Sequence, residues 1–364
     1  MDSGPSGRPP VAGRNAPEPG RVAGSMQTKS REIRLASRPA GFPAPENYEL
    51  AEVTQREPGP GEVLVRNTVM SVEPYMRGRM NDTKSYVPPF ALGACMQGGA
   101  VGFVVASNDP ALPEGTWVQS MHGWREYALG KAQEFQPIDT SLAPASAYLG
   151  VLGVPGLTAW AGLKHVGEMK PSDVVFISSA AGAVGAIAGQ LVKLGGATAI
   201  GSAGGAEKVQ YLTEKLGYDA AFDYKGGDVA AKLAKAAPGG IDLYFDNVGG
   251  EQLEAALGAL KPFGRVAACG MISGYNGEMP GPRNMLQIVG KRLRIQGFIV
   301  VDYMKRIPEF LADVGPYLRS GKLVAPETYF EGIEAAPEAF DNLLRGGAHV
   351  GKILVRLAPE GTKP

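Results

Sequence analysis

The segment around residues 174–194 constrains the fold of this chain more than any other. An apolar run, Val174–Ile177, leads into the turn Ala180-Ala181-Gly182-Ala183-Val184-Gly185 and then into an apolar stretch with helical spacing. Strand, glycine turn and helix open a βαβ unit, where three glycines allow a tight turn, close backbone approach to a pyrophosphate, and packing of helix on strand. Gly182 and Gly185 keep the second and third roles, whereas Ala180 stands at the first. The motif predicts dinucleotide binding, with an ordinary tight turn as the alternative.

The next predicted strand selects among dinucleotides. About 20 residues beyond the glycine turn, an NAD enzyme usually places Asp or Glu to accept from the ribose hydroxyls. This chain has Ser202-Ala203-Gly204-Gly205 there, followed by Lys208. A small glycine-lined pocket with a nearby ammonium and a helix N-terminus suits a 2′-phosphate, so the sequence favours NADPH over NADH. Taken alone, Lys208 is more simply explained as a solvated helix charge.

Apolar runs recur between helix-like stretches from about residue 157 to 325. Beyond the first, they are Ala197–Ile200, Ile241–Phe245, Arg265–Cys269 and Leu293–Phe298. Strands that alternate with helices and glycine turns are typical of parallel βαβ units. We therefore predict an α/β fold with a doubly wound parallel sheet over residues 157–325.

The flanking regions have a β-type pattern. Short runs such as Glu62–Val69 and Ala100–Ala106 are separated by Pro-Gly turns, and a helix around 337–344 and a strand over 352–357 follow near the C-terminus. These features predict one β-rich domain from residues 26–156 and 326–364, with the cofactor domain as an insertion. Residues 1–25, rich in Gly, Pro and Arg, are expected to be a disordered tail or a misassigned start ahead of Met26.

Composition excludes several classes of partner and site. Thirty-six basic and 36 acidic residues cancel, and no apolar run is long enough to span a bilayer, so we expect neither nucleic-acid nor membrane binding. Cys95 and Cys269 are too far apart in sequence for a disulfide framework, which favours a reducing cytoplasm. The three histidines, His122, His165 and His349, lie at no ligand spacing, so we expect no catalytic zinc.

Two polar residues follow predicted strands at the sheet edge where an open α/β sheet binds its ligand. Tyr224, in Asp223-Tyr224-Lys225, could stack or hydrogen-bond near the 2′-phosphate, and Asn247, in Asp246-Asn247-Val248-Gly249-Gly250, could reach the nicotinamide ribose. Each is equally well explained by turn chemistry, because Asn and Gly are ordinary turn residues.

With these features set side by side, the chain resembles the zinc-independent medium-chain dehydrogenase/reductase superfamily. It is most similar to the branch of leukotriene B4 12-hydroxydehydrogenase/prostaglandin reductase, 2-alkenal (double-bond) reductase and curcumin reductase. The likeness extends from about Gln27 to Leu357. The segments that carry it are Glu73-Pro74-Tyr75-Met76-Arg77-Gly78-Arg79-Met80, Ala180–Gly185, Ala203–Lys208, Asp246–Gly250 and Cys269-Gly270-Met271-Ile272-Ser273-Gly274-Tyr275-Asn276.

The resemblance implies a GroES-like β domain, a Rossmann domain, and a homodimer joined through the edges of the Rossmann sheets. It implies NADPH contacts at Ala181, Gly182, Ala183, Val184, Gly185, Gly205, Lys208, Tyr224, Asn247, Cys269, Gly270, Ile272, Ser273, Tyr275, Phe298, Ile299 and Val300. Tyr275 would lie near the substrate carbonyl, and Tyr75 would line the pocket from the other domain. Family members usually carry Asn before the last Gly-Lys, where this chain has His349, and whether His349 takes over that cofactor contact is left open.

The hypothesis for function is an enzyme that transfers hydride from NADPH to the β-carbon of an α,β-unsaturated aldehyde or ketone. The Tyr275 hydroxyl or the cofactor ribose hydroxyl would stabilise the enolate oxygen, and water would supply the proton. Without the resemblance, Tyr75 and Tyr275 are amphipathic residues at a domain seam. A quinone reductase and a non-catalytic NADPH-binding protein are the alternatives, and the sequence does not identify the enone.

Overall fold

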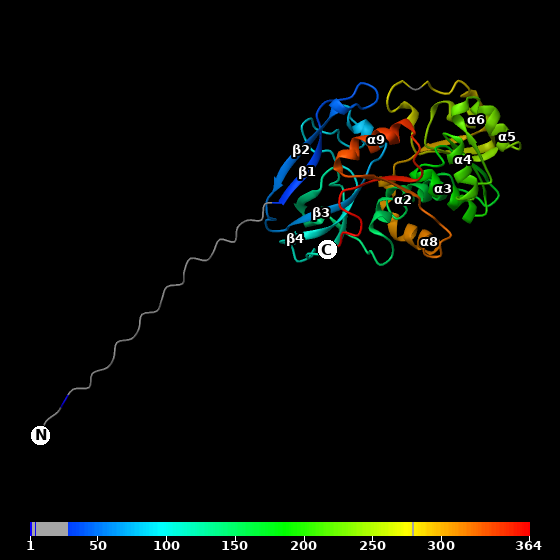
Figure 1. Ribbon diagram of the computed structural model, residues 1–364. Coiled ribbons are helices and arrows are strands. Elements are labelled where there is room, and N and C mark those ends of the chain that lie inside the picture. The colour runs from blue at the N-terminus through cyan, green and yellow to red at the C-terminus, as the bar shows by residue number, and fades with distance from the viewer. Residues whose placement is uncertain (2–3, 5–27, 279) are drawn as a thin grey trace.

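The computed structural model describes residues 1, 4, 28–278 and 280–364. The prediction for residues 1–25 therefore lies outside the described residues, apart from Met1 and Gly4. The chain forms two lobes, and the C-terminus lies beside β4 in the lobe that contains β1–β4 (Figure 1). Each lobe is built on its own sheet. No described helix combines the length and apolarity that crossing a bilayer requires.

The first lobe contains a seven-stranded mixed sheet and an antiparallel pair. The sheet has the order β14-β15-β3-β4-β5-β7, with β6 also paired to β3. Its strands are β3 (Glu62–Ser71), β4 (Ala100–Ser107), β5 (Trp117–Ser120), β6 (Tyr127–Lys131), β7 (Gln136–Pro137), β14 (Glu327–Glu331) and β15 (Lys352–Arg356), and the separate pair is β1 (Thr28–Leu35) with β2 (Tyr48–Gln55). Because β15 pairs antiparallel with β3, the C-terminal segment completes the first sheet.

The second lobe contains six parallel strands in the order β10-β9-β8-β11-β12-β13. They are β8 (Val174–Ile177), β9 (Thr198–Ala203), β10 (Ala220–Asp223), β11 (Ile241–Asp246), β12 (Leu260–Ala268) and β13 (Arg294–Gly297). The connection reverses direction between β8 and β11, which makes this a Rossmann sheet with its switch point there. In such sheets ligands bind outside the carboxyl ends of the strands, next to the switch point.

Helices flank both sheets. They are α1 (Tyr75–Arg79), α2 (Val154–Ala161), α3 (Ala183–Leu194), α4 (Ala206–Glu214), α5 (Val229–Ala236), α6 (Gly250–Ala259), α7 (Leu286–Lys291), α8 (Ile307–Arg319) and α9 (Ala336–Arg345). Short 3₁₀ turns cover Pro45–Asn47, Ala132–Glu134, Ala145–Leu149, Tyr224–Gly226, Ile272–Gly274, Val300–Arg306 and Ile333–Ala335, and a π turn covers Gly162–Val166.

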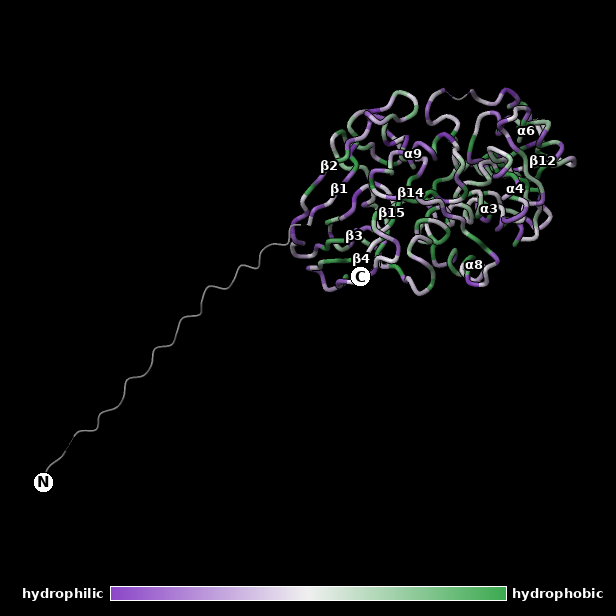
Figure 2. The backbone as a smooth tube through the Cα atoms, viewed as in Figure 1, coloured by the Kyte–Doolittle hydropathy of each residue, from purple (hydrophilic) through white to green (hydrophobic). Residues whose placement is uncertain are grey.

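Each lobe has its own apolar core. In the first, Met70, Trp124 and Phe340 pack where α9 covers the sheet, and in the second, Ile187 of α3 and Phe310 of α8 lie on the central strands. Figure 2 shows apolar segments running through the region of β3, β4 and β15. Strand β8 is almost wholly buried, which explains its continuous apolar sequence, because a parallel sheet is covered on both faces.

The predicted elements agree with the structure in type, and differ at two strands. A strand was expected before Tyr224 but was given no range, because β10 has four residues at the edge of the sheet and only Phe222 among them is buried. Strand β12 begins at Leu260, five residues before the predicted run, and includes the exposed Phe263 with φ of 64°. The predicted start of the cofactor domain at residue 157 falls inside α2.

Candidate cofactor and substrate site

The turn between β8 and α3 is tight and leaves little room for side chains at its glycines. Gly182 precedes the helix, and a Cβ at Gly185 would lie 2.4 Å from the Ser179 carbonyl oxygen, so only glycine fits there. Ser179 itself has φ of 49°. The sharp turn is thus made at Ser179, and the buried Ala180 has no need of the glycine that usually stands at its position. The first amides of α3 remain available to an anion.

The loop after β9 forms a cationic pocket. Gly205, with φ of 103°, precedes α4, and Lys208 is only 8% exposed. Among the described residues, Lys208 has neither a carboxylate nor a hydrogen-bond partner on its ammonium. Burial and the neighbouring Lys225 lower its pKa to about 8. The solvated helix charge considered for Lys208 is therefore wrong, because only 8% of the residue is exposed.

Tyr224 and His349 surround the same pocket. A Cβ at Gly204 would lie 3.3 Å from the Tyr224 ring, and the Tyr224 hydroxyl points toward Gly346. Burial, and then the charges of Lys208 and Lys352, lower the pKa of His349 to about 4, and its Nδ1 lies 2.9 Å from Asn342 Oδ1. Sequence reasoning left His349 open, and the structure brings it within electrostatic reach of Lys208.

The C-terminal segment lies directly on the phosphate turn. The Gly351 amide donates to the Ala181 carbonyl at 2.8 Å, and Gly351 and Gly182 form a parallel bridge. Lys352, next along the chain, is 5% exposed and donates to the Val72 carbonyl at 2.8 Å. The two domains are therefore joined by backbone at the cofactor end.

Asn247 is fixed at the carboxyl end of β11 by the turn after β8. Its side-chain amide donates to the Ser178 carbonyl at 2.8 Å, and its backbone amide to Ser178 Oγ at 2.9 Å. The preceding Asp246 is fully buried and accepts from the Tyr244 hydroxyl and the amides of Val248 and Gly249. Burial raises the pKa of Asp246. No role for Asp246 was predicted from the sequence. Its carboxylate holds the loop after β11 by accepting from the Val248 and Gly249 amides.

A cleft of about 590 Å³ opens at the carboxyl ends of β12 and β13. Its lining consists of Ala268, Cys269, Gly270, Met271, Tyr275, Gly297, Phe298, Ile299 and Asp302. Five predicted cofactor residues therefore come together here. Ile272, Ser273 and Val300 do not line the cleft, because the amides of Ile272 and Ser273 turn toward the Asn247–Val248 loop and Val300 packs on the core. Those three assignments remain predictions.

Tyr275 lines this cleft, and two tyrosines of the other domain, Tyr75 and Tyr86, lie nearby. The Tyr275 hydroxyl accepts from the Met271 amide at 3.4 Å, and burial raises the pKa of both Tyr275 and Tyr75, so each hydroxyl stays protonated near neutral pH. Tyr86, on the exposed loop before β4, lies within electrostatic reach of both. No sequence pattern pointed to Tyr86, because its polar loop comes close to Tyr275 and Cys269 only in the folded chain.

The described part of the chain contains no group of three His, Cys, Asp or Glu side chains that could hold a metal. Cys269, beside the cleft, is instead apolar in character, since burial raises its pKa to about 12. The residues that are present fit NADPH. Lys208, which is 8% exposed and has no ammonium partner among the described residues, follows the Gly204–Gly205 turn, and a tight backbone turn precedes a helix at the sheet's switch point.

Two family descriptions match the sequence. "N-terminal domain of oxidoreductase" matches residues 31–138, and "Zinc-binding dehydrogenase" matches residues 183–314. The words "zinc-binding" in the second description contrast with the described residues, which contain no group of three His, Cys, Asp or Glu side chains that could hold a metal.

Relatives match along almost their whole length. The chain is 42% identical to the NADPH-dependent curcumin reductase of Escherichia coli, with 92% of this chain and 99% of that protein covered. It is 40% identical to a 2-alkenal reductase (NADP(+)-dependent) of Nicotiana tabacum, with the same coverage. Among solved structures, CurA from Vibrio vulnificus in complex with NADPH is 42% identical, with a TM-score of 0.85 over 90% of this chain and 99% of that one.

Proposed function

The chain belongs to the zinc-independent medium-chain dehydrogenase/reductases, and we propose that it reduces the carbon-carbon double bond of α,β-unsaturated aldehydes and ketones with NADPH. The observation that carries the proposal is the placement of the Lys208 pocket and the tyrosine-rimmed cleft along one edge of one sheet. The named activities of the curcumin reductase and 2-alkenal reductase relatives support it.

The cofactor would lie along this edge from Lys208 to the cleft. Lys208, Tyr224 and Gly205 would hold the 2′-phosphate, the Ala181–Gly185 turn the pyrophosphate, and Asn247 the nicotinamide ribose. His349 would stand beside the 2′-phosphate as a neutral hydrogen-bonding group. Bound NADPH supplies a hydride, which an enone accepts at its β-carbon while negative charge develops on its oxygen.

Tyr275 is proposed to stabilise that charge. Its hydroxyl is protonated near neutral pH, because burial raises its pKa, and it therefore can donate to the developing enolate oxygen. Tyr75 and Tyr86 would bound the pocket from the other domain. Water is the proposed source of the proton that completes the product at the α-carbon.

We also propose a homodimer formed through the edge of the Rossmann sheet. β13 is the edge strand, and its Ile295 is 39% exposed. Leu286 and Val289 of α7, just before this strand, are 80% and 73% exposed. An open strand edge beside exposed apolar side chains is a surface that a second copy would cover. The two free cysteines favour a cytoplasmic location.

Absorbance of the reduced nicotinamide tests the proposed activity. Purified protein is mixed with NADPH and, in parallel, with a short 2-alkenal, a quinone, or buffer. We expect oxidation with the alkenal and at least tenfold slower turnover when NADH replaces NADPH. Oxidation with the quinone alone contradicts the proposal in favour of a quinone reductase, and tight NADPH binding without oxidation by either contradicts it in favour of a binding protein.

A further inference from the structure

Arg77 is a buried cation that the proposed chemistry does not use. It lies in α1, two residues after Tyr75, and is only 3% exposed. Its guanidinium donates to neutral oxygens: the carbonyls of Gly41 and Pro39, Asn81 Oδ1 at 2.7 Å, and Asn276 Oδ1 at 3.0 Å. No ion pair involves Arg77 in the described part of the chain. Burial of a charge without a counter-charge costs free energy. The burial of Arg77 among neutral oxygens therefore needs an explanation.

One of these acceptors belongs to the other domain. Gly41, Pro39 and Asn81 lie in the β-rich domain with Arg77 itself, whereas Asn276 lies on the Rossmann side, 199 residues away and directly after Tyr275. The two loops also touch through backbone, because a Cβ at Gly41 would lie 3.7 Å from the Asn276 carbonyl oxygen. The Arg77–Asn276 bond thus crosses the domain boundary at the substrate end of the cleft.

Apart from the local bonds of Tyr275 to Met271 and Ile272, the bonds that tie the Tyr275 loop to other elements lie near its two ends, within the residues that the structure describes. At its start, the Ser273 hydroxyl and amide donate to the Val248 carbonyl. At its end, the Arg283 amide and the Asn284 side chain are held by Glu254 of α6. Asn276 lies between these anchors. Because Asn276 directly follows Tyr275, its bond to Arg77 can fix the position of Tyr275.

We propose that Arg77 is a positioning residue that fixes the Tyr275 loop through Asn276 and so sets the affinity for the enone. This inference rests on the proposed function. It assigns Arg77 no direct contact with NADPH, because the guanidinium bonds of Arg77 are all made to oxygens of the protein. A charge-assisted bond to a neutral amide predicts an increase in KM of about tenfold when the bond is lost.

The test compares Asn276→Ala with Asn81→Ala. Each removes one side-chain acceptor of Arg77, but only the first crosses the domain boundary. Hydrogen exchange of the free protein should become faster over residues 271–278 in Asn276→Ala alone. In turnover assays, Asn276→Ala should raise KM for a 2-alkenal about tenfold, with kcat changed less than threefold and the NADPH dissociation constant unchanged, and Asn276→Asp, which keeps the acceptor, should restore KM.

Equal effects of the two alanine variants, or unchanged exchange over residues 271–278 in Asn276→Ala, would overturn the proposal. Because exchange is measured without substrate, it tests the Arg77–Asn276 bond even where the wild-type protein reduces no enone. Failure of the proposed function is seen instead as the absence of wild-type turnover.

Discussion

The two ends of the proposed site are built in different ways. At the cofactor end, buried backbone does most of the positioning: Gly185 approaches Ser179, and the Gly351 amide joins the domains by bonding to Ala181. At the substrate end, side chains on loops do this work, with Tyr86 exposed and Arg77 reaching Asn276 across the domain boundary. The cofactor end is therefore expected to be rigid and specific for NADPH, and the substrate end adjustable.

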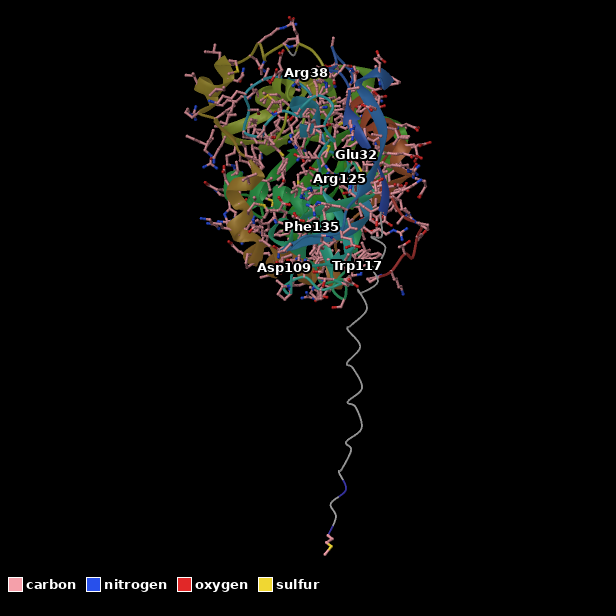
Figure 3. All side chains as sticks on the ribbon, turned by 90° about the vertical axis from the view of Figure 1, so that its left-hand side faces the viewer. Glu32, Arg38, Asp109, Trp117, Arg125 and Phe135 are labelled. Carbon is pink, nitrogen blue, oxygen red and sulfur yellow. The ribbon has the colours of Figure 1, made fainter. Side chains whose placement is uncertain are left out.

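Side chains also hold a loop within the β-rich domain. Figure 3 places Arg38 at one end of this lobe and Asp109 and Trp117 at the other. Arg38 donates to the carbonyls of Met80 and Phe90, and thus holds both ends of the loop that carries Tyr86. Side-chain bonds to carbonyls and one backbone bond, from the Phe90 amide to the Arg79 carbonyl at 2.7 Å, hold this loop.

Replacement of Gly185 should produce the largest effect. In Gly185→Val, the new Cβ would stand 2.4 Å from the Ser179 carbonyl oxygen, so α3 must move away from the phosphate turn. We expect loss of NADPH binding by calorimetry and a decrease of about 3 kcal/mol in the free energy of unfolding. Gly239→Ala, where a Cβ meets nothing within 4 Å, is the control. Retained NADPH affinity in Gly185→Val would contradict the expectation that the cofactor end is rigid.

Tyr275→Phe should lower kcat/KM for an enone by about a hundredfold, because removal of an oxyanion donor typically has such an effect. Its NADPH dissociation constant should not change. Tyr75→Phe is the matched variant in the other domain and should lower kcat/KM less than tenfold. If Tyr275→Phe turns over normally, the ribose hydroxyl carries the charge and the substrate end plays a smaller chemical role than proposed.

Lys208→Ala should weaken NADPH binding by about thirtyfold or more and leave NADH binding unchanged, since only NADPH carries the 2′-phosphate. The pH dependence sharpens this prediction. Because the pKa of Lys208 is about 8 in the free protein, wild-type NADPH affinity should fall as the pH rises through 8, and the variant should lose that fall. Identical pH profiles for wild type and variant would remove Lys208 from the cofactor site.

The effect of Lys208 on stability has the opposite sign. Its pKa is lower in the folded protein than the usual 10.5, so the unfolded chain binds more protons between pH 8 and 10.5. The contribution of Lys208 to the free energy of unfolding should therefore rise with pH in this window. Urea titrations of wild type and Lys208→Met check it.

His349→Asn should have the smallest effect. A pKa of about 4 keeps His349 neutral at pH 6–8, so Asn replaces one neutral hydrogen-bonding group by another. We expect NADPH affinity to change less than about fivefold. A wild-type affinity that strengthens from pH 8 to pH 6, and that the variant lacks, would instead mean that His349 is charged in the complex.

The difference between the two ends also explains what the sequence could predict. The parallel βαβ fold and the glycine turn depend on local patterns, and they were predicted even though Ala180 breaks the usual motif. The reason, a positive φ at Ser179, is a backbone property that no residue type reveals. The role of Lys208 in the cofactor site stays a prediction, and its burial was not apparent from a helix that is mostly polar.

At the substrate end, the family resemblance alone led to predicted residues, namely Tyr75 and Tyr275. Tyr86 lies in a polar loop whose approach to the cleft depends on how the two domains meet. Arg77 lies in a segment that resembles the family, but its partner Asn276 is 199 residues away, and no periodicity connects them. The range of strand β10 was not predicted either, since an edge strand buries too little apolar surface to show a pattern.

The most direct test of the proposed reaction follows a labelled hydride. NADPH that carries deuterium at the transferred position is turned over with a short enone, and the product is examined by NMR. We predict deuterium at the β-carbon of a saturated aldehyde or ketone. Deuterium at the carbonyl carbon of an unsaturated alcohol would contradict it.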